Sequence, residues 1–227
     1  MYIAIDTSTE TASLALARDD SILAELTWHC GQNHTVQLLP ALSGLLNQVG
    51  FSTREAKGII VARGPGSYNG LRVGLSTAKG LAVSLDVPLA GISTLEAEAY
   101  QCRERSLPVC AIFNAGRGEI AAAIYEGEGK NWTRIVAEHI TSLDALCKHI
   151  SNPTVFCGEY IPAIKSELQN RLGDNALIVS PARLLRRAGY LAELGIQRLI
   201  SGDHDDPVTL QPLYLRAPPI TQPRPRP

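Results

Sequence analysis

The chain has 227 residues, 45% of them hydrophobic and 19% charged, and its 21 Lys and Arg against 22 Asp and Glu give a formal net charge of −1. This composition is that of an ordinary globular protein, and it excludes a disordered chain and a small scaffold held by disulfides or metals. The near-neutral charge also argues against a protein that binds nucleic acid alone, because such binding depends mostly on clustered Lys and Arg.

The first half predicts a meander of strands and then a helix. Period-two patterns predict strands at residues 2–6, 11–18 and 21–28. From Leu38 the apolar residues recur at the spacing of an amphipathic helix with one buried face, and Gly50 is its candidate C-cap. Pro40 predicts a bend or a late start, because proline removes a helical hydrogen bond.

The rest of the chain repeats this order. The first half continues with a strand at 58–61, a helix at 70–85, a strand at 88–92 and a helix to about residue 103. Ser93 and Glu96 would open that last helix with a capping box. The second half predicts strands at about 108–114, 118–125 and 131–137, a helix at 142–150, a strand at 155, a helix at 161–171, a strand at 176–179 and a helix at 182–200. Both halves read βββαβαβα, which indicates two structural copies.

This organisation predicts an α/β protein of two units with a cleft between them. The expected units are residues 1–104 and 105–200, followed by a C-terminal segment, 201–227. Such junctions commonly bind a nucleotide or another small ligand. The end of the chain, from Pro218 to Pro227, is rich in proline and is expected to be extended. Its Arg224 and Arg226 could contact RNA, although two charges supply little affinity.

Cysteine usage and hydropathy indicate a cytoplasmic protein. The five cysteines are scattered and form no C-x-x-C pair, which is typical of reduced thiols. The chain begins with a strand pattern, so no signal peptide is expected. The longest weakly charged stretch, residues 71–92, still contains charged side chains and Pro88, which argues against a membrane span.

A glycine-rich loop separates a predicted strand from a predicted helix. The backbone N–H groups of Gly64, Gly66 and Ser67 could bind an anion at the helix N-terminus, although the segment matches neither a Walker A loop nor a nucleophile elbow. The alternative is a tight turn that needs glycine. The helix then carries small residues at Gly70, Gly74 and Ala78, which would allow close approach by a helix of the same domain or of another chain.

The end of the first strand is a candidate phosphate site. Asp6, Thr7 and Ser8 stand where sugar kinases and actin-like proteins place a phosphate loop and a carboxylate that orients magnesium. That loop usually has glycine after the aspartate, so phosphate binding here should be weak. The alternative is that Asp6 accepts hydrogen bonds within a turn.

The histidines and cysteines predict no metal site. Two ligands on one helix face need i, i+4 spacing, but Leu38 stands four residues after His34. His29 and Cys30 are adjacent and would point in opposite directions at the end of a strand. No third group that could orient a Cys–His catalytic pair is visible.

Four segments together resemble the TsaB (YeaZ) family over nearly the whole chain. They are residues 3–8, residues 34–35 ahead of 38–40, residues 64–74 and residues 212–216, of which 64–74 is the most specific. The family is similar to the TsaD enzymes, so the resemblance implies two actin-like (ASKHA, RNase H-like) domains. Two departures are Tyr68-Asn69, where the family usually has Phe-Thr, and Thr35-Val36, where it usually has Ser-Glu.

The resemblance implies a non-catalytic subunit of the bacterial machinery that installs N6-threonylcarbamoyl on the adenosine next to the tRNA anticodon. In that family TsaD transfers the group from threonylcarbamoyl-adenylate, TsaB dimerises with TsaD, and the TsaE ATPase joins the assembly. The isolated chain would then form a homodimer without a cofactor. ATP and magnesium are expected only in the assembled complex, which would also provide the contact with tRNA.

The resemblance also implies which residues matter. The catalytic relatives carry H-x-x-x-H on the first helix, where this chain has Leu38 as the second residue, and a glycine-rich second phosphate loop, where residues 157–159 hold one glycine. Family dimers use the first two helices, so the implied partner interface includes His34, Leu38, Leu39, Leu42, Gly70, Arg72, Val73, Gly74, Thr77 and Ala78. The rival interpretations are a free-standing metallopeptidase, a sugar-kinase-like phosphotransferase, and a homodimer that acts alone as an interaction module.

Overall fold

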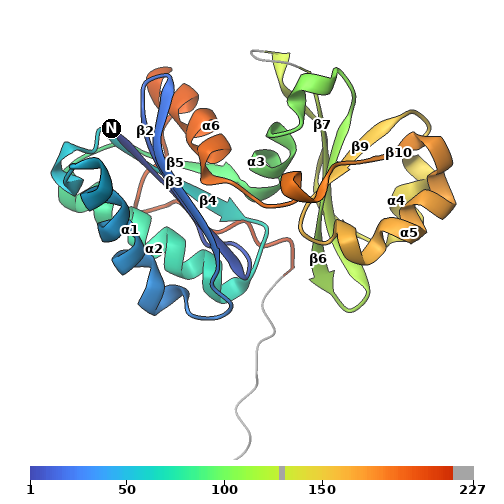
Figure 1. Ribbon diagram of the computed structural model, residues 1–227, viewed down its shortest axis with the longest axis horizontal. Coiled ribbons are helices and arrows are strands. Elements are labelled where there is room, and N and C mark those ends of the chain that lie inside the picture. Colours follow the sequence, from blue (N-terminus) through green and yellow to red (C-terminus); the bar gives the residue numbers. More distant parts are fainter. Residues whose placement is uncertain (128–130, 217–227) are drawn as a thin grey trace, which may run out of the picture.

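The computed structural model describes residues 1–127 and 131–216, so the proline-rich segment 218–227 lies outside the described residues. It consists of two mixed five-stranded sheets with helices on both faces of each (Figure 1). The predicted α/β fold class is confirmed, and the order βββαβαβα is present in both halves. No helix among the described residues is long and apolar enough to cross a membrane.

The first sheet has the order β3-β2-β1-β4-β5. Its strands are β1 (Tyr2–Asp6), β2 (Thr11–Arg18), β3 (Ser21–His29), β4 (Gly58–Gly64) and β5 (Leu89–Ser93). Strands β1, β2 and β3 pair antiparallel, whereas β4 is parallel to β1 and β5 to β4. Strand β1 is therefore the central strand. Asp6 is its last residue and lies at the end of the strand that faces the second half.

The alternation of side-chain size along these strands decides which helices cover each face. Ile3 and Ile5 of β1 share a core with helices α1 (His34–Val49) and α2 (Tyr68–Leu85). Ala4 between them faces helix α6 (Ala188–Ile200) on the opposite side of the sheet. Large side chains thus fill the space under α1 and α2, and alanines allow α6 to lie close to the other face.

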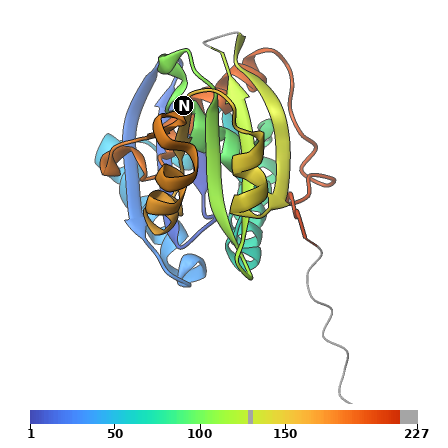
Figure 2. The same cartoon turned by 90° about the vertical axis from the view of Figure 1, so that its right-hand side faces the viewer.

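The second sheet has the order β10-β9-β6-β7-β8, which is the topology of the first sheet repeated. Its strands are β6 (Val109–Gly116), β7 (Glu119–Glu126), β8 (Thr133–Thr141), β9 (Thr154–Cys157) and β10 (Ala176–Ile178). Helices α4 (Leu143–His149) and α5 (Ile161–Leu172) cover its outer face, which is turned toward the viewer in Figure 2.

Each half contributes one helix that packs on the sheet of the other half. Helix α3 (Thr94–Tyr100) follows β5 of the first sheet, but its Leu95 and Ala99 are buried with residues of the second sheet. Helix α6 follows β10 of the second sheet but packs on the first. The two helices lie between the sheets and contact each other (Figure 1). The division at residue 104 stays a prediction.

Several element boundaries differ from the sequence prediction; strand β8, for example, ends at Thr141 instead of residue 137. Helix α1 begins at His34 and runs through Pro40, so the late start is wrong; Pro40 is exposed, and water can reach the carbonyl that it leaves unbonded. The capping box is also wrong, because the Ser93 side chain makes no capping hydrogen bond and α3 ends at Tyr100. Helix α6 begins at Ala188 because residues 181–183 form a short 3₁₀ turn that starts with proline.

Candidate functional site

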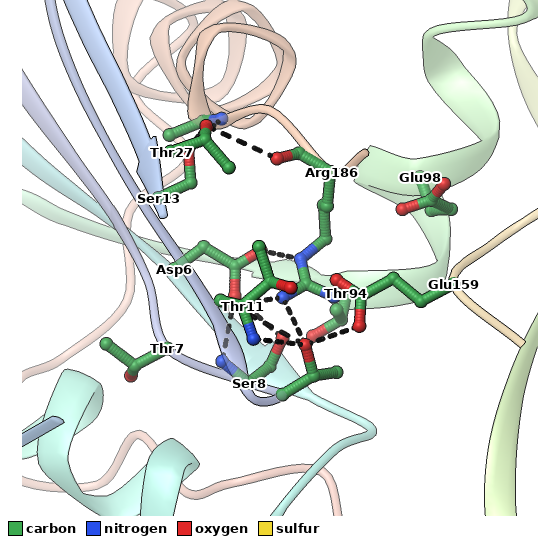
Figure 3. Close-up of polar contacts among 12 residues, drawn as sticks. Asp6, Thr7, Ser8, Thr11, Ser13, Thr27, Thr94, Glu98, Glu159 and Arg186 are labelled. Carbon is green, nitrogen blue, oxygen red and sulfur yellow. Dashed lines mark hydrogen bonds and ion pairs between the residues drawn. The ribbon is translucent and has the colours of Figure 1, made fainter. Parts of the chain in front are cut away.

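A buried ion pair lies where the two halves meet. Asp6 ends β1, Arg186 lies two residues before α6, and the Arg186 Nε donates a hydrogen bond of 2.5 Å to Asp6 Oδ2 (Figure 3). Both side chains are 1% exposed. Burial alone would lower the pKa of the guanidinium, but the carboxylates of Asp6 and Glu159 outweigh it and raise that pKa.

The rest of the Arg186 guanidinium reaches both halves. Its Nη2 donates to Thr9 Oγ1 and to the carbonyl of Thr11, each at 2.9 Å. Its Nη1 faces Glu159 Oε1 at 3.3 Å, and its carbon lies 5.5 Å from the centre of the Phe113 ring. Thr9 Oγ1 in turn donates to Glu159 Oε2 at 2.7 Å, so one network joins the end of β1 to the segment after β9.

The remaining groups of the predicted phosphate loop are also used internally. Asp6 Oδ1 accepts hydrogen bonds from the backbone N–H of Ser8 at 2.9 Å and from its hydroxyl at 2.6 Å. Thr7 Oγ1 donates to the carbonyl of Gly70 at 2.8 Å, and the Ser67 N–H donates to the carbonyl of Ser8 at 2.6 Å. The turn interpretation of Asp6 describes these contacts, because its side chain closes the loop as an Asx turn does.

The glycines of the loop and of α2 are required by this close packing. A Cβ atom would lie 2.2 Å from the Ser8 carbonyl oxygen at Gly66, 2.1 Å from the Thr7 carbonyl oxygen at Gly70 and 2.3 Å from Thr7 Oγ1 at Gly74. Such separations are shorter than any real Cβ contact. The small residues therefore let α2 approach the chain's own residues 7–8.

Gly64 has a different role. Its φ of +115° is in the region that favours glycine, and a Cβ there would lie 2.7 Å from the carbonyl oxygen of Leu213. Its N–H donates to Thr94 Oγ1 at 3.1 Å. The loop is bonded to α3 in this way, and the carbonyl of Arg63 before it accepts the Leu213 N–H of the C-terminal segment at 2.7 Å.

Glu98 of α3 lies beside the network but outside its hydrogen bonds (Figure 3). The side chain is fully buried, its Oε1 accepts from Gln101 at 2.7 Å, and its Oε2 has no hydrogen-bond partner among the residues that the structure describes. Burial raises the pKa of Glu98 well above its ordinary value, against the opposing charge of Arg186.

Two neighbouring cavities open between the halves. One, of about 450 Å³, is lined by Thr9, Glu10, Gly66, Ser67, Phe113, Asn114, Ala115, Glu159 and Tyr160. The other, of about 460 Å³, shares some of these walls and adds Tyr68, Ile140 and residues 213–216. Of the predicted phosphate contacts, Gly66 and Ser67 line the first cavity, whereas Asp6, Thr7, Ser8 and Gly64 are buried outside it.

The donor set of the first cavity does not fit a nucleotide with its metal. Its nine described lining residues include two carboxylates, Glu10 and Glu159, and no Lys or Arg, so phosphates would meet negative charge. Asp6, the candidate to orient magnesium, is already paired with Arg186. Among residues 1–127 and 131–216, no group of three or more His, Cys, Asp or Glu is placed to hold a metal ion.

The counterpart of the second phosphate loop lies at a different place from the one that the sequence predicts. Because β6 and β7 repeat the places of β1 and β2, the segment 115–118, which is the end of β6 and the turn after it, is the counterpart of residues 7–10. It contains Gly116 and Gly118, both at positive φ. The sequence prediction looked for this loop at residues 157–159, which are instead the counterpart of the segment at Gly64.

The predicted partner residues divide into two sets. Leu39 and Arg72 are exposed, and Val73 and Thr77 are partly exposed, whereas the others are buried within the chain: His34, Leu38, Leu42, Gly70, Gly74 and Ala78. Of these six, Leu42 lines an open hollow at the surface, and the other five are buried against the chain's own residues. His34 Nε2, for example, is 2.8 Å from the carbonyl oxygen of Thr9.

Apart from Arg72 and the partly exposed Lys79 of α2, the exposed surface of α1 and α2 carries no charge. We call the uncharged part the outer face; it comprises Val36, Leu39, Pro40, Ser43 and Asn47 of α1 and Val73, Thr77, Gly80 and Ser84 of α2. Helix α1 has no Asp, Glu, Lys or Arg anywhere along its length. Beside the outer face, a hollow of about 300 Å³ opens between Leu39, Phe51 and Leu81.

Sequence reasoning missed the centre of the site. Nothing in the sequence marks Arg186, because a lone arginine carries no signal of burial when its partner, Asp6, is 180 residues away. Glu98 is likewise one of two glutamates in its predicted helix, and the sequence does not mark it as buried. Their environment is created by the exchange of α3 and α6, which periodicity does not reveal.

Comparison with known proteins gives a consistent result. A family model for TsaD, tRNA N6-adenosine threonylcarbamoyltransferase, matches residues 28–205. The chain is 33% identical over 217 residues to the tRNA threonylcarbamoyladenosine biosynthesis protein TsaB of Bacillus subtilis, covering 94% of this chain and 93% of that protein. It is 35% identical over 126 residues to the Escherichia coli TsaB, covering 55% and 54%. The solved structure of YeaZ from Pseudomonas aeruginosa shares the fold, with a TM-score of 0.78, 24% identity, and coverage of 94% of this chain and 99% of that one.

Proposed function

Because the chain belongs to the TsaB (YeaZ) family of tRNA threonylcarbamoyladenosine biosynthesis proteins, we propose that it is a non-catalytic subunit that dimerises with TsaD and activates it. TsaE is the further partner in this proposal. The chain would contact tRNA only through the assembly, in keeping with its net charge of −1.

The outer face of α1 and α2 is the observation that carries the proposal. Leu39 and Val36 are 54% and 67% exposed, and the face between them and the small residues of α2 has no charge that would have to be desolvated. The centres of protein interfaces are depleted in charged residues in the same way. The hollow next to Leu39 offers a place for a side chain of the partner.

The cleft supports the non-catalytic part of the proposal. Asp6 is committed to Arg186, and the cavity beside it presents carboxylates where phosphates would have to bind. Leu38, at the second position of the metal motif, is buried in the core of the first half. ATP and magnesium would therefore act at sites of the assembled complex, and the isolated chain would form a homodimer through the same outer face.

The interface can be tested with one charge. Leu39→Asp would bury an unpaired carboxylate at the contact, and we expect its affinity for TsaD to fall by about tenfold or more. Ile135→Asp is the matched control, because Ile135 is 50% exposed on β8 of the other half. Both variants should keep the circular dichroism spectrum of the parent. Equal affinity of the two variants would refute the placement of the interface.

The function is tested by reconstitution. Threonylcarbamoylation of tRNA by TsaD and TsaE should depend on adding this chain, and the Leu39→Asp variant should restore less activity than Ile135→Asp at equal concentration. If TsaD and TsaE modify tRNA equally well without the chain, the proposed function is wrong.

A further inference from the structure

We propose that Arg186 is an internal counter-ion that holds the two halves of the chain together across the cleft, so that the cleft stays closed without any bound ligand. The residues around Asp6 do not fit a nucleotide with its metal, so another role is needed for the buried charges of this site. The proposal concerns the isolated chain and does not depend on the proposed function.

The backbone of Arg186 is fixed to the first half. The N–H of Ala188 donates to Ser13 Oγ at 2.9 Å, and Thr27 Oγ1 lies 3.5 Å from the Arg186 carbonyl oxygen (Figure 3). Next to them, the N–H of Gly189 donates to Glu25 Oε1 at 2.8 Å. Since three strand residues hold this segment, the arginine loses little further freedom when its guanidinium binds.

The guanidinium of this fixed residue contacts groups of both halves. On the first half it binds Asp6, Thr9 and the carbonyl of Thr11. On the second half it faces Glu159 at 3.3 Å and the ring of Phe113. The planar fork of arginine suits this task, because its five N–H groups can serve several acceptors at fixed angles, which lysine could not do.

The charges make the contact sensitive to the loss of the arginine. Asp6 and Glu159 both carry carboxylates toward the same guanidinium, one from each half. Without the positive charge they would repel each other, and Asp6 would be buried without a counter-ion. Opening the cleft and admitting water relieves both costs, which is why an open form is expected in the absence of Arg186.

The experiment measures the distance between the halves in the full chain. Spin labels are placed at Asp20→Cys in the turn after β2 and at Ser166→Cys on α5, both exposed, with the partly buried Cys147 changed to serine. Labelled protein is diluted into excess unlabelled protein, so that only distances within one chain contribute. The parent should show a single distance, unchanged by adding ATP and magnesium.

Two variants test whether Arg186 holds the two halves together, and a third variant serves as the control. Arg186→Gln should add a second population at a different distance and accelerate amide exchange of residues 7–11 by about tenfold or more. Glu159→Gln keeps the Asp6–Arg186 pair and should show a smaller second population with nearly unchanged thermal stability. Glu167→Gln alters an exposed α5 glutamate that binds Arg171 and should change nothing.

Two results would overturn the proposal. One is a single distance, equal to that of the parent, in folded Arg186→Gln and in folded Glu159→Gln. The Arg186 and Glu159 side chains would then contribute to stability alone and would not keep the cleft closed. The other is a shift of the parental distance on adding ATP and magnesium, because the closed cleft would then depend on a ligand. If Arg186→Gln does not fold, the comparison of Glu159→Gln with Glu167→Gln decides the question.

Discussion

Replacing Gly70 by alanine is expected to destabilise the protein, although alanine is the better helix former. The new Cβ would lie 2.1 Å from the carbonyl oxygen of Thr7, and ordinary contact begins at 3.4 Å, so loop and helix must separate by about 1.3 Å. That movement also strains the buried hydrogen bond from Thr7 Oγ1 to the Gly70 carbonyl. Alanine therefore brings a clash and a weakened bond together.

The magnitude follows from three opposing contributions. Overpacking costs about 1–3 kcal/mol, and the weakened hydrogen bond costs about 1 kcal/mol. The helix propensity of alanine returns about 0.5–1 kcal/mol. We expect a net loss of about 2 kcal/mol in the free energy of unfolding, or a Tm lower by about 4–8 °C for a chain of this length.

Gly80 of the same helix provides the control, because a Cβ there meets no atom of the described part of the chain within 4 Å. Gly80→Ala should raise stability by about 0.5–1 kcal/mol. Both variants are compared by urea unfolding followed by circular dichroism. Equal stability of Gly70→Ala and Gly80→Ala would show that the close packing of α2 on residues 7–8 is not required.

Three further outcomes are expected. Glu98→Gln should become more stable relative to the parent as pH rises. Burial raises the pKa of Glu98 above its ordinary value of 4.5, so above pH 4.5 the unfolded parent releases this proton before the folded parent does, and the parent loses stability. Urea unfolding that gave the same difference in free energy between the two proteins at pH 4 and at pH 8 would contradict this. Asp205→Ala should cost about 1–3 kcal/mol, because that carboxylate accepts the Gly91 N–H at 2.7 Å and is 23% exposed. Asp203→Ala, at 61% exposure, should cost less than about 1 kcal/mol in the same thermal unfolding assay. Pro40→Ala should stabilise the protein by about 1–3 kcal/mol, since it restores a hydrogen bond inside α1; a lower Tm would refute this.

The strand and helix order could be predicted because the size or the hydrophobicity of the side chains recurs at regular spacings. Ile3 and Ile5 alternate with Ala4 in β1, and Leu38, Leu42 and Leu45 recur on one side of α1, so the two periods are visible in the sequence. The packing partners were not predictable in the same way. An amphipathic helix shows that it has an apolar side but not which sheet will cover it.

The candidate site was predictable only in part, for a similar reason. The glycines between Gly64 and Gly74 were visible, because glycine at such spacing marks a special backbone or a close approach. The choice between phosphate binding and internal packing depended on where residues 7–8 lie. The role of Arg186 depended on contacts with Asp6 and Glu159, which are distant in sequence and are brought together only by the fold.

The exchange of α3 and α6 has a consequence for folding. A fragment that ended near residue 104 would keep all five strands of the first sheet but would lack α6, which covers Ala4 and Ile60. The second half alone would lack α3, and with it the cover over Val109 and Ala123. Neither half can bury its inner face without the other. We therefore expect a single cooperative unfolding transition from a chain whose topology is that of two repeated units. We also expect slow folding, because the last helix must return to the first sheet before the core of that sheet is complete.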